Sequence, residues 1–325
     1  MISTYRRILS VLAILCLAVG FSACGSDKKS DTKSSGAPAG GKTITQDPAN
    51  ASKGTITVGS KNFTEQFILG EIYAQTLEAQ GFKVKRHLNL GSEQVAYKAL
   101  KGGDIDMYPE YTGTSLINFF KVKPADVPKQ PDVAYNQVKA DYAKQGITAL
   151  AHTPFSNTYV ITSTKKTADK IGDPKTMTEL FSGKGKNLSI SGFPECRQRK
   201  DCLLGLRSDF GYKGKFVSSD GKFNDLDQGN SDLTLAFSTD PQLALTNKYV
   251  AYTDDKRFFP PYNIALGIKD AVAKKIGPKT ISTLEAVQTG MTEEAMRELN
   301  RRVELEKQEP KTVAAAYLKE EGFTK

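Results

Sequence analysis

The chain has 325 residues and a formal charge of +9, with 45 Lys and Arg, 36 Asp and Glu, two histidines and no tryptophan. This length is enough for one large domain or two lobes with a sizeable core, and the basic residues form no block with interleaved aromatics, so nucleic-acid binding is not expected. The sequence lacks a Gly-rich phosphate loop and a GxSxG motif, so neither an enzyme nor a cofactor is expected.

The N-terminal segment has the pattern of a targeting signal. Arg6 and Arg7 precede an apolar run that is too short to span a bilayer with margin. The run ends in the letters FSAC, which resemble the lipobox of bacterial lipoproteins. Residues 1–23 are therefore expected to be removed as a lipoprotein signal peptide, and Cys24 to carry the lipid that anchors the protein outside the cytoplasmic membrane. A plain secretory signal, cut at a small residue, is the alternative.

Residues 24–54 are rich in Gly, Ser, Lys and Ala and nearly free of large apolar side chains, which predicts a flexible tether. Strand and helix patterns alternate after the tether. Its first part reads as a βαβαβ unit, with strands at 55–58, 84–90 and 104–108 and helices at 64–81 and 92–103. Buried strands with short connections of this kind favour a parallel or mixed sheet with helices on both faces.

The letters GGDIDMYPEYTGT, residues 102–114, concentrate recognition groups at a strand end. Because proline cannot donate to a β-ladder, the strand is expected to end at Pro109, and the residues from Glu110 to Thr114 are expected to leave the sheet as a loop. Tyr108 and Tyr111 are candidates to face a cation, since tyrosine offers the best ring face in a chain without tryptophan. The alternative is that both rings pad the core.

A second alternating run begins near Thr158. Five strands are expected in it, at 158–163, 188–191, 215–218, 233–237 and 249–253, and the stretch after 274 is nearly all helix. We predict two α/β lobes, formed by residues 55–154 with 262–325 and by residues 155–261. The chain would cross between them near 152–158 and return near 258–262, and a cleft between two lobes favours a small ligand.

Two cysteines of the folded part lie in the letters PECRQRKDC. Outside the membrane, Cys196 and Cys202 are expected to form a local disulfide. A metal site is less expected, because neither His87 nor His152 is near them in the sequence.

Five segments together resemble the substrate-binding proteins of osmoprotectant ABC importers, which are extracytoplasmic receptors for glycine betaine, choline, carnitine and related quaternary amines. The segments are GSKNFTEQ (59–66), LNLGSEQVAYKALKGGDIDMYPEYTGT (88–114), FSNTY (155–159), AFSTDPQL (236–243) and DDKRFFPPYNIAL (254–266). The resemblance excludes the signal, the tether and the PECRQRKDC insertion. It implies a type II periplasmic-binding-protein fold, in which two α/β lobes joined by a two-segment hinge close over the ligand.

In proteins of this kind, tyrosines from both lobes form an aromatic box around the trimethylammonium group. Carried over by motif, Tyr111, Tyr159 and Tyr262 would be walls of the box. The fourth wall would be Phe237, where relatives often have tyrosine, so the ring face is kept and the hydroxyl is lost. Asn157 stands where other members present an acidic or amide group.

The resemblance also implies groups for a ligand carboxylate. Lys61 and Thr114 match family positions, and Arg197 falls where a basic residue of the second lobe is expected. Arg199 or Lys200 can serve instead of Arg197, and all three can be solvated.

The resemblance thus implies a lipid-anchored extracytoplasmic receptor, expected to be a monomer, that delivers a quaternary amine to an ABC permease and its ATPase. Lys61 and Arg197 favour glycine betaine over choline, which has no carboxylate. A receptor for an amino acid or a polyamine is the alternative. A primary ammonium needs carboxylate or carbonyl acceptors, however, whereas the expected box positions are aromatic.

Overall fold

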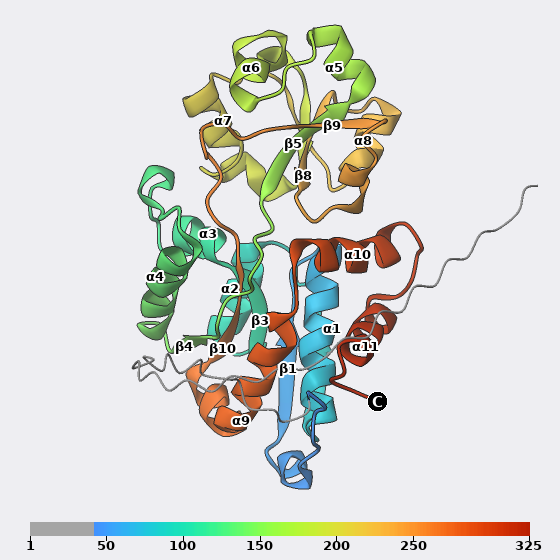
Figure 1. Cartoon of the computed structure of the whole chain (residues 1–325). Helices are drawn as coiled ribbons and strands as arrows, with labels where there is room; N and C mark the ends of the chain where they lie inside the picture. The colour runs from blue at the N-terminus through green and yellow to red at the C-terminus, as the bar shows by residue number, and fades with distance from the viewer. Residues whose placement is uncertain (1–41) are drawn as a thin grey trace, which may run out of the picture. The chain divides into compact units, whose positions relative to one another are not determined.

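The computed structural model describes residues 42–325, which contain two five-stranded sheets (Figure 1). The first sheet has the order β2-β1-β3-β10-β4. Its strands are β1 (Thr55–Gly59), β2 (Lys83–His87), β3 (Met107–Tyr111), β4 (Ile147–Ala149) and β10 (Ile264–Lys269). Strand β1 is parallel to β2 and β3, whereas β10 is antiparallel to both β3 and β4.

The second sheet has the order β7-β6-β8-β5-β9 and repeats this plan. Its strands are β5 (Tyr159–Thr164), β6 (Ile190–Gly192), β7 (Phe216–Ser218), β8 (Leu233–Phe237) and β9 (Tyr249–Tyr252). Strand β6 is parallel to β7 and β8, and β5 is antiparallel to β8 and β9. In each sheet the antiparallel strand is the first one after the chain has passed over from the other sheet. Strand β5 follows β4 of the first sheet, and β10 follows β9 of the second.

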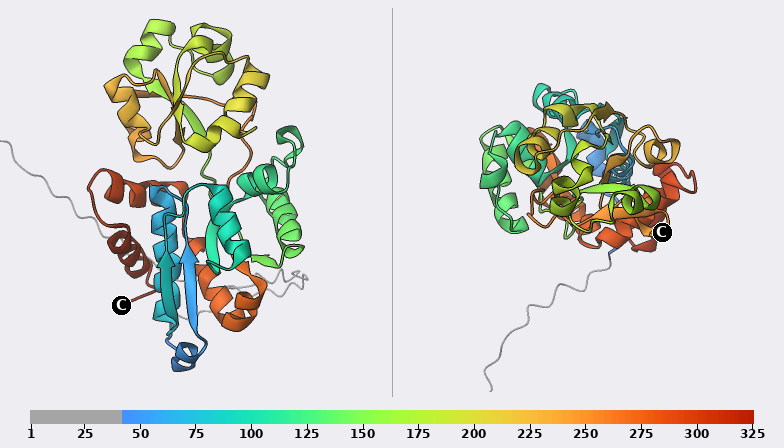
Figure 2. Two further views of the ribbon diagram at one scale, coloured as in Figure 1. Left: turned by 180° about the vertical axis from the view of Figure 1, so that it is seen from behind. Right: turned by 90° about the horizontal axis from the view of Figure 1, so that it is seen from above.

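The first lobe consists of the first sheet and nine helical segments. They are α1 (Thr64–Ala79), α2 (Glu93–Gly102), α3 (Thr112–Thr114), the π-helical turn η2 (Ser115–Phe119), η3 (Pro124–Asp126), α4 (Pro131–Ala143), α9 (Asp270–Thr289), α10 (Glu293–Glu304) and α11 (Pro310–Glu320). Helix α1 is apolar on several sides, and Ile68, Leu69, Ile72 and Leu77 are fully buried. A helix of this kind needs partners around it, and the three C-terminal helices pack against it (Figure 2).

The second lobe consists of the second sheet and seven helical segments of four to eight residues. They are α5 (Lys165–Ile171), α6 (Met177–Ser182), η4 (Lys184–Asn187), η5 (Pro194–Gln198), α7 (Leu203–Phe210), α8 (Phe223–Gln228) and η6 (Pro241–Ala244). The two α/β lobes predicted from the sequence are therefore present.

Two segments of chain connect the lobes, one between β4 and β5 and one between β9 and β10 (Figure 1). The two segments touch each other through an isolated antiparallel bridge between Ser156 and Asn263. The boundaries predicted at 154/155 and 261/262 lie within these connecting segments. Strands of both lobes begin or end where the connecting segments start and finish.

The prediction that the third strand ends at Pro109 is wrong. Strand β3 continues to Tyr111, and Pro109 pairs with Leu266 of β10. The carbonyl oxygen of Pro109 accepts a hydrogen bond of 2.9 Å from Nε2 of Gln66, so the polar backbone groups of Pro109 face away from β10. A proline in such a position removes no bond from the β3–β10 ladder. The strand therefore carries Tyr111 to its end before the chain turns into α3.

The end of the predicted tether is ordered against the first lobe. Residues Pro48–Ser52 form a short 3-10 helix, η1. The amide of Ile44 donates to the carbonyl of Phe323 at 2.8 Å, and Nδ2 of Asn50 donates to the carbonyl of Gln80 at 2.8 Å. Hydrogen bonds of this kind hold a polar segment in place even where it has few apolar side chains. The tether prediction is thus wrong for residues 42–54.

The signal peptide, Cys24 and the remainder of the tether lie outside the described residues. Among residues 42–325, no helix has the length and apolar character needed to cross a membrane.

Candidate functional site

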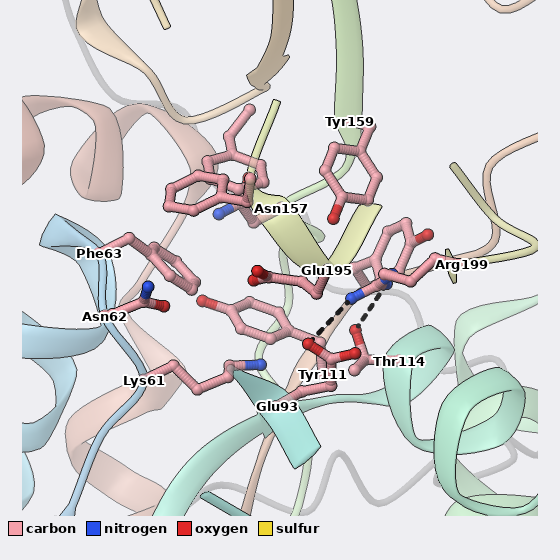
Figure 3. Close-up of a pocket in the computed structure, with 13 residues that line it drawn as sticks. Lys61, Asn62, Phe63, Glu93, Tyr111, Thr114, Asn157, Tyr159, Glu195 and Arg199 are labelled. Atoms are coloured by element: carbon pink, nitrogen blue, oxygen red, sulfur yellow. Dashed lines mark hydrogen bonds and ion pairs between the residues drawn. The ribbon is translucent and has the colours of Figure 1, made fainter. Parts of the chain in front are cut away.

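A pocket lies where the strand ends of both lobes meet the connecting segments (Figure 3). Its cavity volume is about 40 Å³, so the lining side chains nearly fill it. Thirteen residues line it: Lys61, Asn62, Phe63, Glu93, Tyr111, Thr114, Asn157, Tyr159, Phe193, Glu195, Arg199, Phe237 and Tyr262. Seven of the eight predicted ligand-binding residues are among them, and Arg197 is the exception.

Strand ends place most of these side chains. Tyr111 is the last residue of β3, Tyr159 the first of β5 and Phe237 the last of β8. Lys61 follows the end of β1, and Tyr262 lies in the segment that leads into β10. Strand ends and the loops after them are the usual position of ligand sites in open α/β sheets.

Six aromatic rings from both lobes line the pocket. The ring of Phe63 lies 6.1 Å from that of Tyr111 and 5.2 Å from that of Phe237, measured between centroids. The ring of Tyr159 lies 5.4 Å from Phe237 and 5.7 Å from Tyr262, with the last pair nearly perpendicular at 87°. Phe193 is the sixth ring, 5.9 Å from Phe237. The walls of the pocket are thus mainly aromatic rings. The face of each ring carries negative potential, and its edge carries positive potential.

The structure places Arg199, and not Arg197, at the pocket. The side chain of Arg197 is exposed, donates to Oγ of Ser218 at 2.9 Å and lies 5.2 Å from the ring centroid of Phe216. Arg199 follows the η5 turn with extended backbone, which directs it inward, and it is only 6% exposed. The expectation that Arg197 supplies the basic group of the second lobe is therefore wrong, and Arg199 takes this position at the pocket. Lys200, the other alternative, is exposed.

Arg199 is the centre of a buried network of charges. It donates to both carboxylate oxygens of Asp201, at 3.0 and 2.6 Å, and its guanidinium lies 3.6 Å from Glu93. A weaker bond of 3.4 Å reaches Oγ1 of Thr114 in the first lobe, while the hydroxyl of Tyr262 donates to Asp201 at 2.7 Å. Burial by itself lowers the pKa of Arg199, but Asp201 and its neighbours outweigh this and raise the pKa well above its usual range. The guanidinium is therefore charged at every physiological pH.

Lys61 is also paired within the protein. Its ammonium group forms a buried ion pair with Glu110 and lies 4.4 Å from the ring centroid of Tyr111. Glu110 accepts two further hydrogen bonds, from the hydroxyl of Tyr108 at 2.9 Å and from the amide of Tyr111 at 2.7 Å. Tyr108 is fully buried and does not line the pocket, so of the two tyrosines in this strand only Tyr111 faces it.

Glu65 links the lobes beneath the pocket. Its carboxylate accepts from the hydroxyl of Tyr111 at 2.8 Å and from Oγ1 of Thr239, in the second lobe, at 2.7 Å. Burial raises the pKa of Glu65 above its usual value, although both hydrogen bonds oppose the change. Nearby, Oδ1 of the buried Asn157 has no hydrogen-bond partner among residues 42–325.

Residues 54–320 match the protein family described as the substrate-binding domain of the ABC-type glycine betaine transport system. The chain belongs to this family. The family consists of transport substrate-binding proteins, which are not enzymes. Among residues 42–325, no group of His, Cys, Asp and Glu side chains is arranged to hold a metal ion.

Individual members of the family are moderately similar to the chain. It is 30% identical over 280 residues to a glycine-betaine-binding protein of Pseudomonas aeruginosa, a match that covers 82% of this chain and 88% of that protein. It is 28% identical over 276 residues to an ergothioneine transport permease/ergothioneine binding protein of Helicobacter pylori. That match covers 82% of this chain and 48% of the relative, so the chain spans about half the length of this relative.

The fold is that of the family as well. A solved structure described as a glycine betaine/carnitine/choline ABC transporter superposes with a TM-score of 0.65 at 24% identity, covering 82% of this chain and 98% of that one. The type II periplasmic-binding-protein fold expected from the sequence is thereby confirmed.

Several lining residues were not found from the sequence. Phe63 and Phe193 contribute two rings, and Glu93 and Glu195 contribute two carboxylates. The signal for Phe63 was its place two residues after Lys61 in the same loop. Phe193 and Glu195 lie in or next to the PECRQRKDC segment, which the family resemblance does not cover, so no motif pointed to them.

This segment is closed by a disulfide between Cys196 and Cys202, whose Cα atoms are 5.3 Å apart. Both sulfur-bearing side chains are buried. Between and beside them the loop carries Glu195, Arg199 and Asp201. The cross-link restrains the part of the second lobe that supplies the charged groups of the pocket.

Proposed function

We propose that the protein is the extracytoplasmic receptor of an ABC importer and that it binds a quaternary ammonium osmoprotectant between its lobes. Glycine betaine is the first candidate, and choline and carnitine are the others. The observation that carries this proposal is the set of six aromatic rings, contributed by both lobes, around one pocket. We call these rings the aromatic cage: Phe63, Tyr111, Tyr159, Phe193, Phe237 and Tyr262.

The chemistry of the ligand explains why rings suit it. A quaternary ammonium has no N–H group, so it cannot be held by conventional hydrogen bonds from its charge centre. The negative faces of aromatic rings attract it and exclude water at the same time, with about 0.5–2 kcal/mol for each face. Three or four such faces supply much of the roughly 8 kcal/mol that micromolar binding requires.

The distribution of the rings predicts how binding proceeds. Phe63 and Tyr111 belong to the first lobe, whereas Tyr159, Phe193 and Phe237 belong to the second. The cage is complete only while the lobes are in contact, so a ligand that needs the whole cage favours the closed arrangement. Recognition of that arrangement by the permease and its ATPase would couple binding to transport.

Contacts outside the cage support this arrangement. Helix α10 of the first lobe reaches the loop after β8. Arg297 donates to the carbonyl of Ser238 at 2.8 Å, and Asn300 donates to the carbonyl of Thr239 at 3.1 Å. This loop directly follows Phe237, so docking of the lobes positions that wall of the cage.

The groups for a carboxylate favour glycine betaine among the candidates. Arg199 and Thr114 lie together at one side of the pocket, and Lys61 lies at its floor (Figure 3). Both basic groups already have acidic partners, so a ligand carboxylate would share them with Asp201 and Glu110. The lipid anchor on Cys24 and a monomeric state complete the proposal for this receptor.

Two variants of one residue test the cage. Tyr159 lines the pocket, and its hydroxyl makes no hydrogen bond to another of residues 42–325, so Tyr159→Phe keeps the ring face and removes nothing else. Tyr159→Ala removes the face. Calorimetric titration with glycine betaine and choline is expected to show near-normal affinity for Tyr159→Phe and about a twofold to thirtyfold loss for Tyr159→Ala, as one lost face predicts. Equal affinities in the two variants would remove Tyr159 from the cage.

Binding is also expected to be largely lost in Tyr111→Ala and Tyr262→Ala, which remove one ring from the first lobe and one from the connecting segment before β10. Unaltered affinity in both variants contradicts the cage as a whole. An amino acid or a polyamine remains the alternative class of ligand, and a titration in which only primary amines bind would establish it.

A further inference from the structure

Glu195 is the one lining carboxylate of the pocket that makes no hydrogen bond or ion pair to another of residues 42–325. It belongs to the η5 turn and is half-buried. Figure 3 shows its carboxylate directed into the space near Tyr111, Asn157 and Tyr159, with no hydrogen bond or ion pair drawn to it. The side chain therefore points at the place where the proposed ligand would lie.

The other charges at the pocket are already balanced. Lys61 is paired with Glu110, and Arg199 is paired with Asp201 and lies beside Glu93. Each basic group thus has at least one carboxylate within ion-pair distance. Glu195, by contrast, has no basic group within ion-pair distance among the described residues, although Arg199 and Lys61 lie close enough to act on its charge.

We propose that Glu195 is a specificity-determining residue that supplies the negative counter-charge to the quaternary ammonium of the ligand. The inference rests on the proposed function, and it adds a source of selectivity that the rings alone do not provide. A carboxylate attracts an ammonium by charge without any N–H donor, and it does so more strongly in a partly enclosed site than in water. The cage then recognises both the apolar methyl groups and the positive charge.

The position of Glu195 in the chain supports a fixed role. It precedes Cys196, and the disulfide to Cys202 restrains the turn that carries it. The same loop presents Arg199 four residues later, so one cross-linked segment offers a negative and a positive group to the pocket. A negative and a positive group at one pocket are complementary in sign to the two charges of a zwitterion such as glycine betaine.

The electrostatic surroundings are consistent with this role. Burial raises the pKa of Glu195, and the nearby carboxylate of Glu93 raises it further, whereas a hydrogen bond from its own backbone amide and the charges of Arg199 and Lys61 oppose the change. The carboxylate form is thus destabilised without a ligand. A cation beside it would relieve that destabilisation, so ligand binding and ionisation of Glu195 should favour each other.

The test compares a charged ligand, choline, with a neutral isostere of the same shape. Dimethylbutanol replaces the nitrogen of choline by carbon and carries no charge. Affinities of the purified protein and of its Glu195→Gln variant are measured by calorimetry, with competition for the weaker ligands. Asp220→Asn is the matched control, because Asp220 is an exposed carboxylate of the same lobe that does not line this pocket.

We expect Glu195→Gln to weaken binding of the quaternary amine by at least about tenfold and to leave the affinity for the neutral isostere nearly unchanged. Asp220→Asn should alter neither. Equal losses for the charged and neutral ligands would show a merely structural role and overturn the inference, as would tighter binding by Glu195→Gln, which would mean that Glu195 competes with the ligand.

The experiment distinguishes a failure of the proposed function from a failure of the role proposed for Glu195. If the unaltered protein binds neither choline nor glycine betaine, the proposed function falls. If it binds one of them and Glu195→Gln binds it equally well, the proposed function stands and only the role of Glu195 is lost.

Discussion

Replacing Arg199 by alanine is expected to lower the free energy of unfolding by about 3–5 kcal/mol, the usual cost of breaking a buried ion pair from one side. Arg199 is 6% exposed and Asp201 is fully buried. The two are joined by hydrogen bonds of 3.0 and 2.6 Å, and Glu93, which is 3% exposed, lies 3.6 Å from the guanidinium. Removal of the guanidinium leaves two buried carboxylates without their cation.

The size of this loss in unfolding free energy depends on the hydrogen bonds that Asp201 keeps. Asp201 keeps one hydrogen bond, from the hydroxyl of Tyr262 at 2.7 Å, and this limits the loss. Arg199→Lys keeps the charge but cannot make both bonds to Asp201, so it should cost less than Arg199→Ala. In the double variant Arg199→Ala/Asp201→Asn, much of the loss should be recovered, because the buried charge is removed with its partner.

Urea unfolding of the ligand-free protein, followed by circular dichroism, measures these differences. A loss below about 1 kcal/mol for Arg199→Ala would refute the reasoning, since exposed pairs contribute only this much. Such a result would mean that Arg199 and Asp201 are hydrated in solution, as they would be if the lobes separate readily.

Three further predictions concern the disulfide loop. Arg197→Gln should change stability by no more than about 0.5 kcal/mol, as a surface substitution does, and should not change ligand affinity in calorimetry. Cys196→Ser combined with Cys202→Ser should lower the free energy of unfolding by about 2 kcal/mol, as the loss of a short cross-linked loop predicts, and should weaken ligand binding. Affinity for a quaternary amine should fall as the pH drops through the raised pKa of Glu195, because the protonated acid no longer attracts the cation, and Glu195→Gln should flatten this profile.

Each of these has a contradicting result. A large loss of affinity in Arg197→Gln would return this residue to the site. Equal unfolding curves of the cysteine variant and the oxidised protein would show that the loop needs no cross-link. An acid-induced loss of affinity that persists in Glu195→Gln would assign the titration to another group, with Glu65 as the next carboxylate to examine.

Much of the fold could be predicted because local patterns and long-range packing agree. The apolar residues of α1 recur at helical spacing and are buried on several sides, and the strands of the second lobe begin and end close to their expected positions. Pro109 was misleading, because its effect depends on which side of the strand its nitrogen faces. That orientation is set by pairing with Leu266, more than 150 residues away, and no local pattern reveals it.

The site was predictable where motif positions coincide with strand ends. Tyr111, Tyr159 and Phe237 lie at ends of β3, β5 and β8, which explains why all three reach one pocket. Arg197 and Arg199 could not be distinguished, since the choice depends on where the η5 turn ends and extended backbone begins. The same turn decides that Glu195 points inward.

The central claim is that the pocket selects methylated ammonium groups by means of its ring faces. A calorimetric titration of the purified protein with glycine betaine and, separately, with glycine tests it most directly, because the two ligands differ only in the three methyl groups on nitrogen. The account predicts saturable binding of glycine betaine with a dissociation constant at or below the micromolar range and no measurable binding of glycine at the same concentrations. Binding of glycine that equals or exceeds that of glycine betaine would contradict it.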